Sequence, residues 1–342
     1  SDEGVAQVFE RSNGSFQQVA TLTASQPGDR VGESVDVDGN VAVVGAPGTG
    51  AAGEVYVYEK TGGTWNTTPE VALSNADNLQ DTGPSDEQPP ELNPQPPSDP
   101  NDPRFGSILA IEDDTIVAIG RPGDSSSNTG LLQFRPRQSG QGSSWVYIDQ
   151  FVDLLLPTDV ATEGGFSILT NSDTTDQVAR VFPVGVNPTF ERFGPGQDST
   201  IQDIPGFGAL GDITDPAGSN PIAFVGAEDQ VVVYEAISAG GQVPDFPDSK
   251  TATLKPSTGA TGAGFGTSSI AADGTDVVVG APGETTSGGT GAVYQFQRSS
   301  GSWGQTRRIT APSGVSDFGT SLSLGPSTIY VGDGSNVYTF AR

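Results

Sequence analysis

The sequence feature that most constrains the fold of this chain is a pattern that recurs along it. The pattern begins with a glycine-containing segment, passes an Asp-Gly turn and an apolar run that ends in Gly-Ala-Pro, and then reaches a second apolar run and a tryptophan. Two copies are complete, at residues 30–35, 38–39, 41–47, 53–58 and 65, and at residues 264–268, 273–274, 277–282, 291–296 and 303. Such a repeat predicts units that build a common core by stacking on one another.

Four further copies are less complete. The third passes Phe105-Gly106 and Gly120-Arg121-Pro122 and ends at Trp145, and weaker copies begin at Gly165-Phe166, Phe207-Gly208 and Phe318-Gly319. These residues resemble the FG-GAP repeat, the unit of the propellers of integrin alpha chains and of many secreted bacterial and archaeal proteins. The resemblance extends over nearly the whole chain. It implies a β-propeller with an extracellular or cell-surface location.

Turns and apolar runs inside each copy support the same fold. Asp38-Gly39, Pro47-Gly48 and Gly62-Gly63 separate four strand-length segments in the first complete copy. Residues 41–44 and 277–279 are continuously apolar, which is typical of strands covered on both faces. In a propeller, each four-stranded blade lies between two others and gains that cover. We therefore predict an all-β fold, a β-propeller of four-stranded blades, with the Phe, Gly and Trp of the repeat in the core.

The two ends of the chain predict how the ring closes. Residues 5–11 and 16–24 match the third and fourth strands of a blade, whereas residues 318–324, 328–331 and 337–340 match the first three. We expect residues 16–24 to complete the last blade, so that residues 1–342 form a single propeller domain. This count favours six blades. Seven blades are the alternative, and they require three strands that the sequence does not supply.

The N-terminal segment 1–11 is surplus to such a ring. It can lie on the outer edge of its own blade, or it can add to an open sheet edge of a neighbouring copy and link propellers head to tail. In the second case Val5, Val8 and Phe9 are the expected assembly residues.

Residues 75–103 leave the repeat pattern. This insertion contains eight prolines and seven acidic residues and no Lys or Arg. Its composition predicts a polyproline-II or irregular loop between two blades.

The overall composition excludes several kinds of site and partner. The chain has no Cys, Met or His, which excludes His-based triads, thiolate nucleophiles, disulfides and Cys/His zinc sites. Its 42 acidic and 15 basic residues give a net charge of −27, which disfavours nucleic acid and anionic lipid as partners. The apolar runs are of strand length, so no membrane insertion is expected. The Asp-rich, Lys-poor composition resembles that of proteins from extreme halophiles, and solubility in ordinary salt is the alternative reading.

Calcium is the one cofactor that the repeat suggests, because FG-GAP propellers often carry Asp-rich calcium loops. The nearest candidate ligands are Asp212, Asp215 and Asn220, and a second candidate loop is Asp36-Val37-Asp38-Gly39-Asn40. Both lack the full spacing of a calcium loop, and turn capping is the alternative role for them. Asn13 and Asn66 each begin an Asn-x-Ser/Thr sequon, and we predict that both lie on exposed turns between third and fourth strands, where an exported chain can be glycosylated.

Two classes of function follow from these observations. The first is an extracellular structural or interaction protein, which adheres to another surface protein or glycan or assembles with itself into a filament or coat. The second is a secreted hydrolase with a carboxylate site at the propeller axis, since propellers host both. The missing His and Cys and the surplus strand favour the first class, and we expect no enzyme activity.

Overall fold

The fold is taken from a computed structural model of the chain. It describes residues 4–23, 29–50, 53–74, 104–112, 115–120, 129–136, 145–154, 157–163, 166–171, 178–183, 202–205, 210–214, 221–236, 250–257 and 261–342. Contacts divide the chain into two units, Ser1–Pro157 with Val184–Phe190 (unit 1) and Thr158–Pro183 with Glu191–Arg342 (unit 2). Each unit is described by itself, and the single propeller domain stays a prediction. The insertion 75–103 lies outside the described residues.

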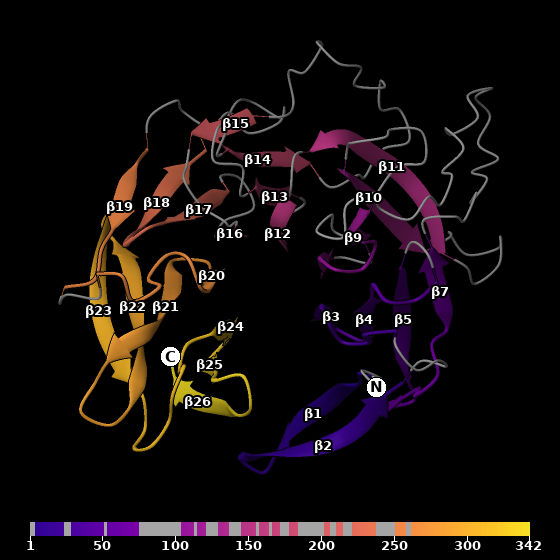
Figure 1. The fold of residues 1–342 in the computed structure, drawn as a ribbon, viewed down its shortest axis with the longest axis horizontal. Coiled ribbons are helices and arrows are strands. Elements are labelled where there is room, and N and C mark those ends of the chain that lie inside the picture. The colour runs from indigo at the N-terminus through magenta and orange to yellow at the C-terminus, as the bar shows by residue number, and fades with distance from the viewer. Residues whose placement is uncertain are drawn as a thin grey trace. The chain divides into compact units, whose positions relative to one another are not determined.

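Unit 1 contains three antiparallel sheets (Figure 1). The first is the hairpin of β1 (Ala6–Ser12) and β2 (Ser15–Leu22). The second has five strands, β3 (Val35–Asp38), β4 (Val41–Ala46), β5 (Glu54–Thr61), β6 (Thr64–Trp65) and β7 (Val71–Ser74), with β6 and β7 both pairing with β5. The third has four, β8 (Leu109–Glu112), β9 (Thr115–Gly120), β10 (Thr129–Pro136) and β11 (Trp145–Leu154).

Unit 2 contains four sheets, each a meander of strands in sequence order. Three of them have four strands: β12 (Pro157–Glu163), β13 (Phe166–Asn171), β14 (Val178–Pro183) and β15 (Gln202–Pro205); β16 (Gly211–Thr214), β17 (Ile222–Ala227), β18 (Gln230–Glu235) and β19 (Ala252–Leu254); β20 (Ile270–Asp273), β21 (Asp276–Thr285), β22 (Thr290–Ser299) and β23 (Ser302–Thr310). The fourth has three, β24 (Ser321–Gly325), β25 (Thr328–Gly332) and β26 (Val337–Ala341).

The all-β prediction is confirmed, and the described residues contain no helix, hence none that is long and apolar enough to cross a membrane. The continuously apolar runs are second strands, as predicted: every residue of β17 is buried, and so are five of the six residues of β4. Their side chains join clusters that extend across neighbouring sheets, such as the one that holds Phe224, Phe265 and Tyr294. Four-stranded meanders packed face to face, together with FG-GAP-type repeats, fit a β-propeller.

Close backbone contact between neighbouring sheets explains the glycines of the repeat. A Cβ added to Gly280 of β21 would lie 2.1 Å from the carbonyl oxygen of Gly319, which follows Phe318 in the next repeat. The same relation joins Gly45 to Gly106 at 1.8 Å and Gly226 to Gly266 at 1.9 Å. In these three cases the glycine that precedes alanine contacts the backbone of the glycine that begins the next repeat. The contact leaves no room for a side chain at the first glycine.

The predicted closure of the last blade is not confirmed. Among the described residues β2 pairs with β1, and the sheet β24–β26 has three strands. The turn Asn13-Gly14 has positive φ at both positions, 50° and 84°, and this is the geometry that joins two adjacent strands into a hairpin. The number of blades is likewise not confirmed.

Candidate functional site

The N-terminal hairpin exposes the apolar residues that the sequence assigns to assembly. Val5 is 48% exposed and Phe9 is 50% exposed. Val8 instead packs against a buried cluster that includes Ala20, Leu22 and Tyr58. Two of the three predicted residues are thus exposed, and the third packs the hairpin against the neighbouring sheet of unit 1.

The second strand of the hairpin adds to this surface in a way that the sequence prediction missed. Phe16 is 38% exposed and Val19 is 47% exposed, both on β2. The sequence of β2 is Ser-Phe-Gln-Gln-Val-Ala-Thr-Leu, which has no charged residue. β1 is the one strand paired with β2 among the described residues, so the other edge of β2 has open backbone groups.

The last sheet of unit 2 also has an open edge, along β26. Tyr338 and Phe340 hold β26 in place because both rings pack edge-to-face on Phe318, at centroid distances of 5.5 and 5.8 Å. Arg342 donates hydrogen bonds to Asp276 at 2.6 Å and to the backbone oxygen of Asp273 at 2.6 Å. These contacts attach β26 to the preceding sheet, β20–β23. Val337, on the opposite face of β26, is 70% exposed.

The predicted calcium ligands are not brought together in the described residues. Asp215 and Asn220 lie outside the described residues. The Asp212 side chain accepts a hydrogen bond from the backbone N–H of Ile213 at 2.8 Å. It accepts a second one from the backbone N–H of Ala272, in the next sheet, at 2.6 Å. The part of the chain that the structure describes holds no cluster of three acidic side chains suited to a metal ion. Asp212 lies within β16, so these contacts differ from the turn capping considered as its alternative role, and the calcium site stays a prediction.

The same contact recurs at two other first strands. Asp36 of β3 accepts from Val37 at 2.8 Å and from Ile111 of β8 at 2.9 Å. Asp159 of β12 accepts from Val160 at 3.0 Å and from Gly211 of β16 at 3.2 Å. We call these three residues the inter-sheet aspartates. Each one accepts one hydrogen bond from the next residue of its own strand and one from the first strand of the next sheet, and the second bond ties the two sheets together.

Burial raises the pKa of the inter-sheet aspartates. The pKa of Asp159 rises to about 7 because its carboxylate is removed from water, although the two backbone N–H donors oppose the rise. Burial also raises the pKa of Asp212 well above its usual value, and the neighbouring carboxylates of Glu163 and Asp159 add to this. Burial and the neighbouring carboxylates thus both favour the protonated form of these side chains in the folded state.

The raised pKa of Asp159 predicts a pH dependence of stability. The folded state keeps this proton up to about pH 7, whereas the unfolded chain releases it near about pH 4, so the contribution of Asp159 to the free energy of unfolding falls as pH rises across that interval. We expect Asp159→Asn, which cannot ionise, to show a shallower fall. Urea unfolding at several pH values and constant salt measures both slopes, and equal slopes would contradict the assignment.

Both predicted glycosylation residues are exposed. Asn13 lies at the tip of the β1–β2 hairpin, and Asn66 follows β6 directly. Their modification stays a prediction. Asn66 donates a side-chain hydrogen bond to Thr61 at 3.5 Å, a contact that a glycan at this nitrogen would replace.

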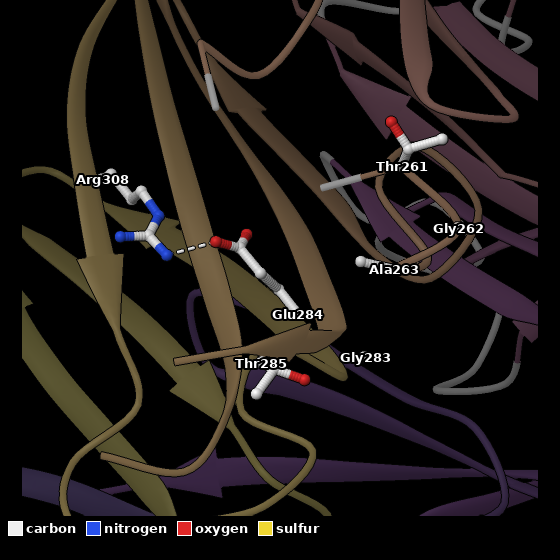
Figure 2. A pocket seen from close by; sticks show the side chains of 7 residues that line it. All are labelled: Thr261, Gly262, Ala263, Gly283, Glu284, Thr285 and Arg308. Carbon is white, nitrogen blue, oxygen red and sulfur yellow. Dashed lines mark hydrogen bonds and ion pairs between the residues drawn. The ribbon is translucent and has the colours of Figure 1, made fainter. Parts of the chain in front are cut away.

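A polar cleft in unit 2 was not found by the sequence reasoning. It has a volume of about 420 Å³, and the residues that line it are Thr261, Gly262, Ala263, Gly283, Glu284, Thr285 and Arg308. Figure 2 shows the Arg308 side chain directed at Glu284, with Thr261 on a separate loop. Glu284 is buried, pairs with Arg308 and accepts a hydrogen bond from the Tyr294 hydroxyl at 2.6 Å.

Comparison with known proteins confirms the repeat. The sequence profile of the FG-GAP repeat matches residues 16–58 and 249–296, so the chain carries FG-GAP repeats in these two segments. They span β2 to β5 and β19 to β22, where the two complete copies of the pattern lie. No curated protein matches the sequence. The resemblance to integrin propellers and to halophilic proteins stays a prediction.

Solved structures share the fold at low sequence identity. A protein of unknown function from Desulfotomaculum acetoxidans is 12% identical, with a TM-score of 0.54 over 95% of this chain and 86% of that one. A candidate 6-phosphogluconolactonase from Bacteroides uniformis is 13% identical, with a TM-score of 0.52 over 90% of this chain and 78% of that one. A likeness at this level concerns the fold alone.

Proposed function

We propose that this protein is an extracellular structural protein, a β-propeller that assembles with itself through its N-terminal hairpin. The observation that carries the proposal is a pair of incomplete sheets. The hairpin β1–β2 has two strands and β24–β26 has three, whereas every other sheet of the described residues has four or five. The hairpin of one copy completes the three-stranded sheet of another through pairing of β2 with β26, and repetition of this step gives a filament or a coat.

The composition of the two edge strands supports this pairing. Soluble proteins protect exposed sheet edges with charged residues, prolines or bulges, because unprotected edges add further strands. Charged residues make up 17% of the chain, yet β2 has none and β26, Val-Tyr-Thr-Phe-Ala, has none. Neither strand contains proline, and β26 pairs without a register shift, whereas β2 has one irregularity, at Val19. This uncharged composition is typical of strands that pair with another strand in the assembled protein.

The large negative charge determines the conditions of assembly. Copies with a net charge of −27 repel one another. Salt limits the range of this repulsion to about 8–10 Å at ordinary ionic strength and to about 3 Å in molar salt. We therefore expect assembly to strengthen with salt. The halophile-like composition and the exposed sequons Asn13 and Asn66 suit an extracellular location in brine.

Pairing of β2 with β26 inside one chain is the competing arrangement, and it would close the six-bladed ring that the sequence predicts. Cross-linking distinguishes the two. Because the chain has no Cys, Val19→Cys on β2 and Val337→Cys on β26 place single thiols on the two edges. A short bis-maleimide added to a mixture of the two single variants in molar salt should give a covalent pair of chains. Val19→Cys mixed with Ser302→Cys, an exposed position on β23, is the control for chance contact.

The outcome of this experiment decides the proposal. A covalent pair in the first mixture and none in the control supports exchange between copies. A cross-link that forms only within a Val19→Cys/Val337→Cys double variant shows that the hairpin closes its own ring and overturns the proposal. Absence of both products overturns it as well.

Removal of the hairpin should abolish assembly. In molar salt we expect the intact chain to form polymers and a chain without residues 1–23 to remain monomeric, because the donated strands are gone. Light scattering and electron microscopy measure the size of the particles, and thermal unfolding confirms that the shortened chain is folded. Polymers of equal length from both chains would contradict the proposal.

A further inference from the structure

The polar cleft of unit 2 differs from the same place in the first complete repeat, although the two repeats share a scaffold. Gly283 donates a backbone hydrogen bond to Ala263 at 3.0 Å, and Gly48 donates the equivalent bond to Asp29 at 3.0 Å. Tyr56 corresponds to Tyr294, since each is the fourth residue of the segment that begins at Gly53 or at Gly291. The two repeats can therefore be compared residue by residue.

The comparison shows that the ion pair of the cleft is not needed by the scaffold. Thr49 stands where unit 2 has Glu284, two residues after the proline in each repeat, and its hydroxyl lies 3.5 Å from that of Tyr56. Ala72 stands where unit 2 has Arg308, because Ala72 pairs with Tyr56 as Arg308 pairs with Tyr294. Neither Thr49 nor Ala72 is charged, so the strands pair in the same way in the first repeat without this ion pair. The buried carboxylate of the first repeat is Asp29, at the position of Ala263, so the pairing of Glu284 with Arg308 belongs to the cleft of unit 2 and not to the shared scaffold.

Arg308 retains hydrogen-bonding capacity toward the cleft. A guanidinium has five N–H donors, and among the described residues those of Arg308 meet only Glu284 and Tyr294. The guanidinium lies over the Tyr294 ring at 5.9 Å from its centroid, and the side chain is 32% exposed. Thr261 and Thr285 are exposed and add hydroxyls that both donate and accept.

We propose that this cleft binds a neutral carbohydrate. The charges that line it cancel, one Arg against one Glu, so it attracts neither cations nor anions strongly. An anionic ligand would compete with Glu284 for Arg308 and meet a buried negative charge, which disfavours it. Sugar hydroxyls both donate and accept, so they match the adjacent guanidinium, carboxylate and threonine groups. The volume of about 420 Å³ lies in the range of small-molecule sites. This inference does not depend on the assembly of the protein.

The test is binding of a defined set of probes by saturation-transfer NMR and calorimetry: maltose, cellobiose and lactose as neutral disaccharides, with glucuronate as the anionic comparison. We expect at least one disaccharide to bind and glucuronate not to. Arg308→Ala should weaken that binding by about tenfold or more, since hydrogen bonds to a charged donor are lost. Failure of all three disaccharides to bind, or binding of glucuronate alone, overturns the proposal.

Two further variants separate loss of the site from loss of the fold. The double variant Glu284→Thr/Arg308→Ala carries the two residues found at these positions in the first repeat. We expect it to unfold at the same temperature as the wild type but not to bind the disaccharide. Arg298→Ala removes a comparable ion pair with Glu235 that lies outside the cleft, and it should bind as the wild type does. Equal binding by wild type and the double variant contradicts the proposal.

Discussion

Replacement of Gly280 by alanine is expected to lower the free energy of unfolding by about 3 kcal/mol. The added Cβ would lie 2.1 Å from the carbonyl oxygen of Gly319 and 2.3 Å from the Ser269 hydroxyl oxygen. Neither atom can move freely, because Ser269 donates a hydrogen bond to that carbonyl at 2.6 Å and Gly319 donates to Gly332 at 2.9 Å. The two sheets must separate to admit the methyl group, which breaks their packing.

Urea unfolding followed by tryptophan fluorescence measures this change. Gly304→Ala is the matched control, because Gly304 lies on β23 of the same sheet with no atom within 4 Å of the added Cβ. We expect the control to have the stability of the wild type or slightly more, since alanine restricts the unfolded chain. Equal stability of Gly280→Ala and Gly304→Ala would show that the glycine contact does not hold the sheets together.

Replacement of Asp212 by alanine is the second large effect, with an expected loss of about 2 kcal/mol in the free energy of unfolding. The change leaves the backbone N–H groups of Ile213 and Ala272 without their acceptor, and it cuts the tie between β16 and β20. Removal of a buried ionisable group, whose charged form is disfavoured by burial and then by Glu163 and Asp159, offsets part of the loss. The loss in the free energy of unfolding is therefore smaller than the loss expected from two unpaired N–H donors alone.

Asp212→Asn gives the control for this prediction. Asparagine keeps one oxygen as an acceptor and removes the charge, so we expect a smaller loss than for alanine. Chemical unfolding of both variants at neutral pH gives the two differences. If alanine is as stable as the wild type, Asp212 is not a tie between sheets. If asparagine is less stable than alanine, its amide group is not accommodated and the hydrogen-bond assignment fails.

The sequence alone predicted most strands of the complete copies and their order, but it placed the start of the fourth copy at Gly165-Phe166, where the structure has the second strand β13 after β12, and it did not predict that β6 and β7 both pair with β5. Asp-Gly and Gly-Gly turns, with apolar runs of strand length between them, are local signals, because a tight turn and its two strands lie close along the chain. The repeat added the expectation of stacked four-stranded units, and the profile match at residues 16–58 and 249–296 confirms its two complete copies. The count of strands also led to the prediction of Val5, Val8 and Phe9 as assembly residues, and only the structure shows that Val8 packs against a buried cluster.

Only the tertiary structure decided which residues join one repeat to the next. The glycine contacts, the inter-sheet aspartates and the pairing of Glu284 with Arg308 link atoms that lie far apart along the chain, and 42 acidic residues give no sign of which few are buried. One signal was present: Thr49 and Glu284 occupy equivalent positions, and their difference marks the cleft. The packing contact of Asp212 is of the same kind. Its partner is a backbone N–H of the next sheet, and no local spacing of side chains can specify a contact that stacking creates.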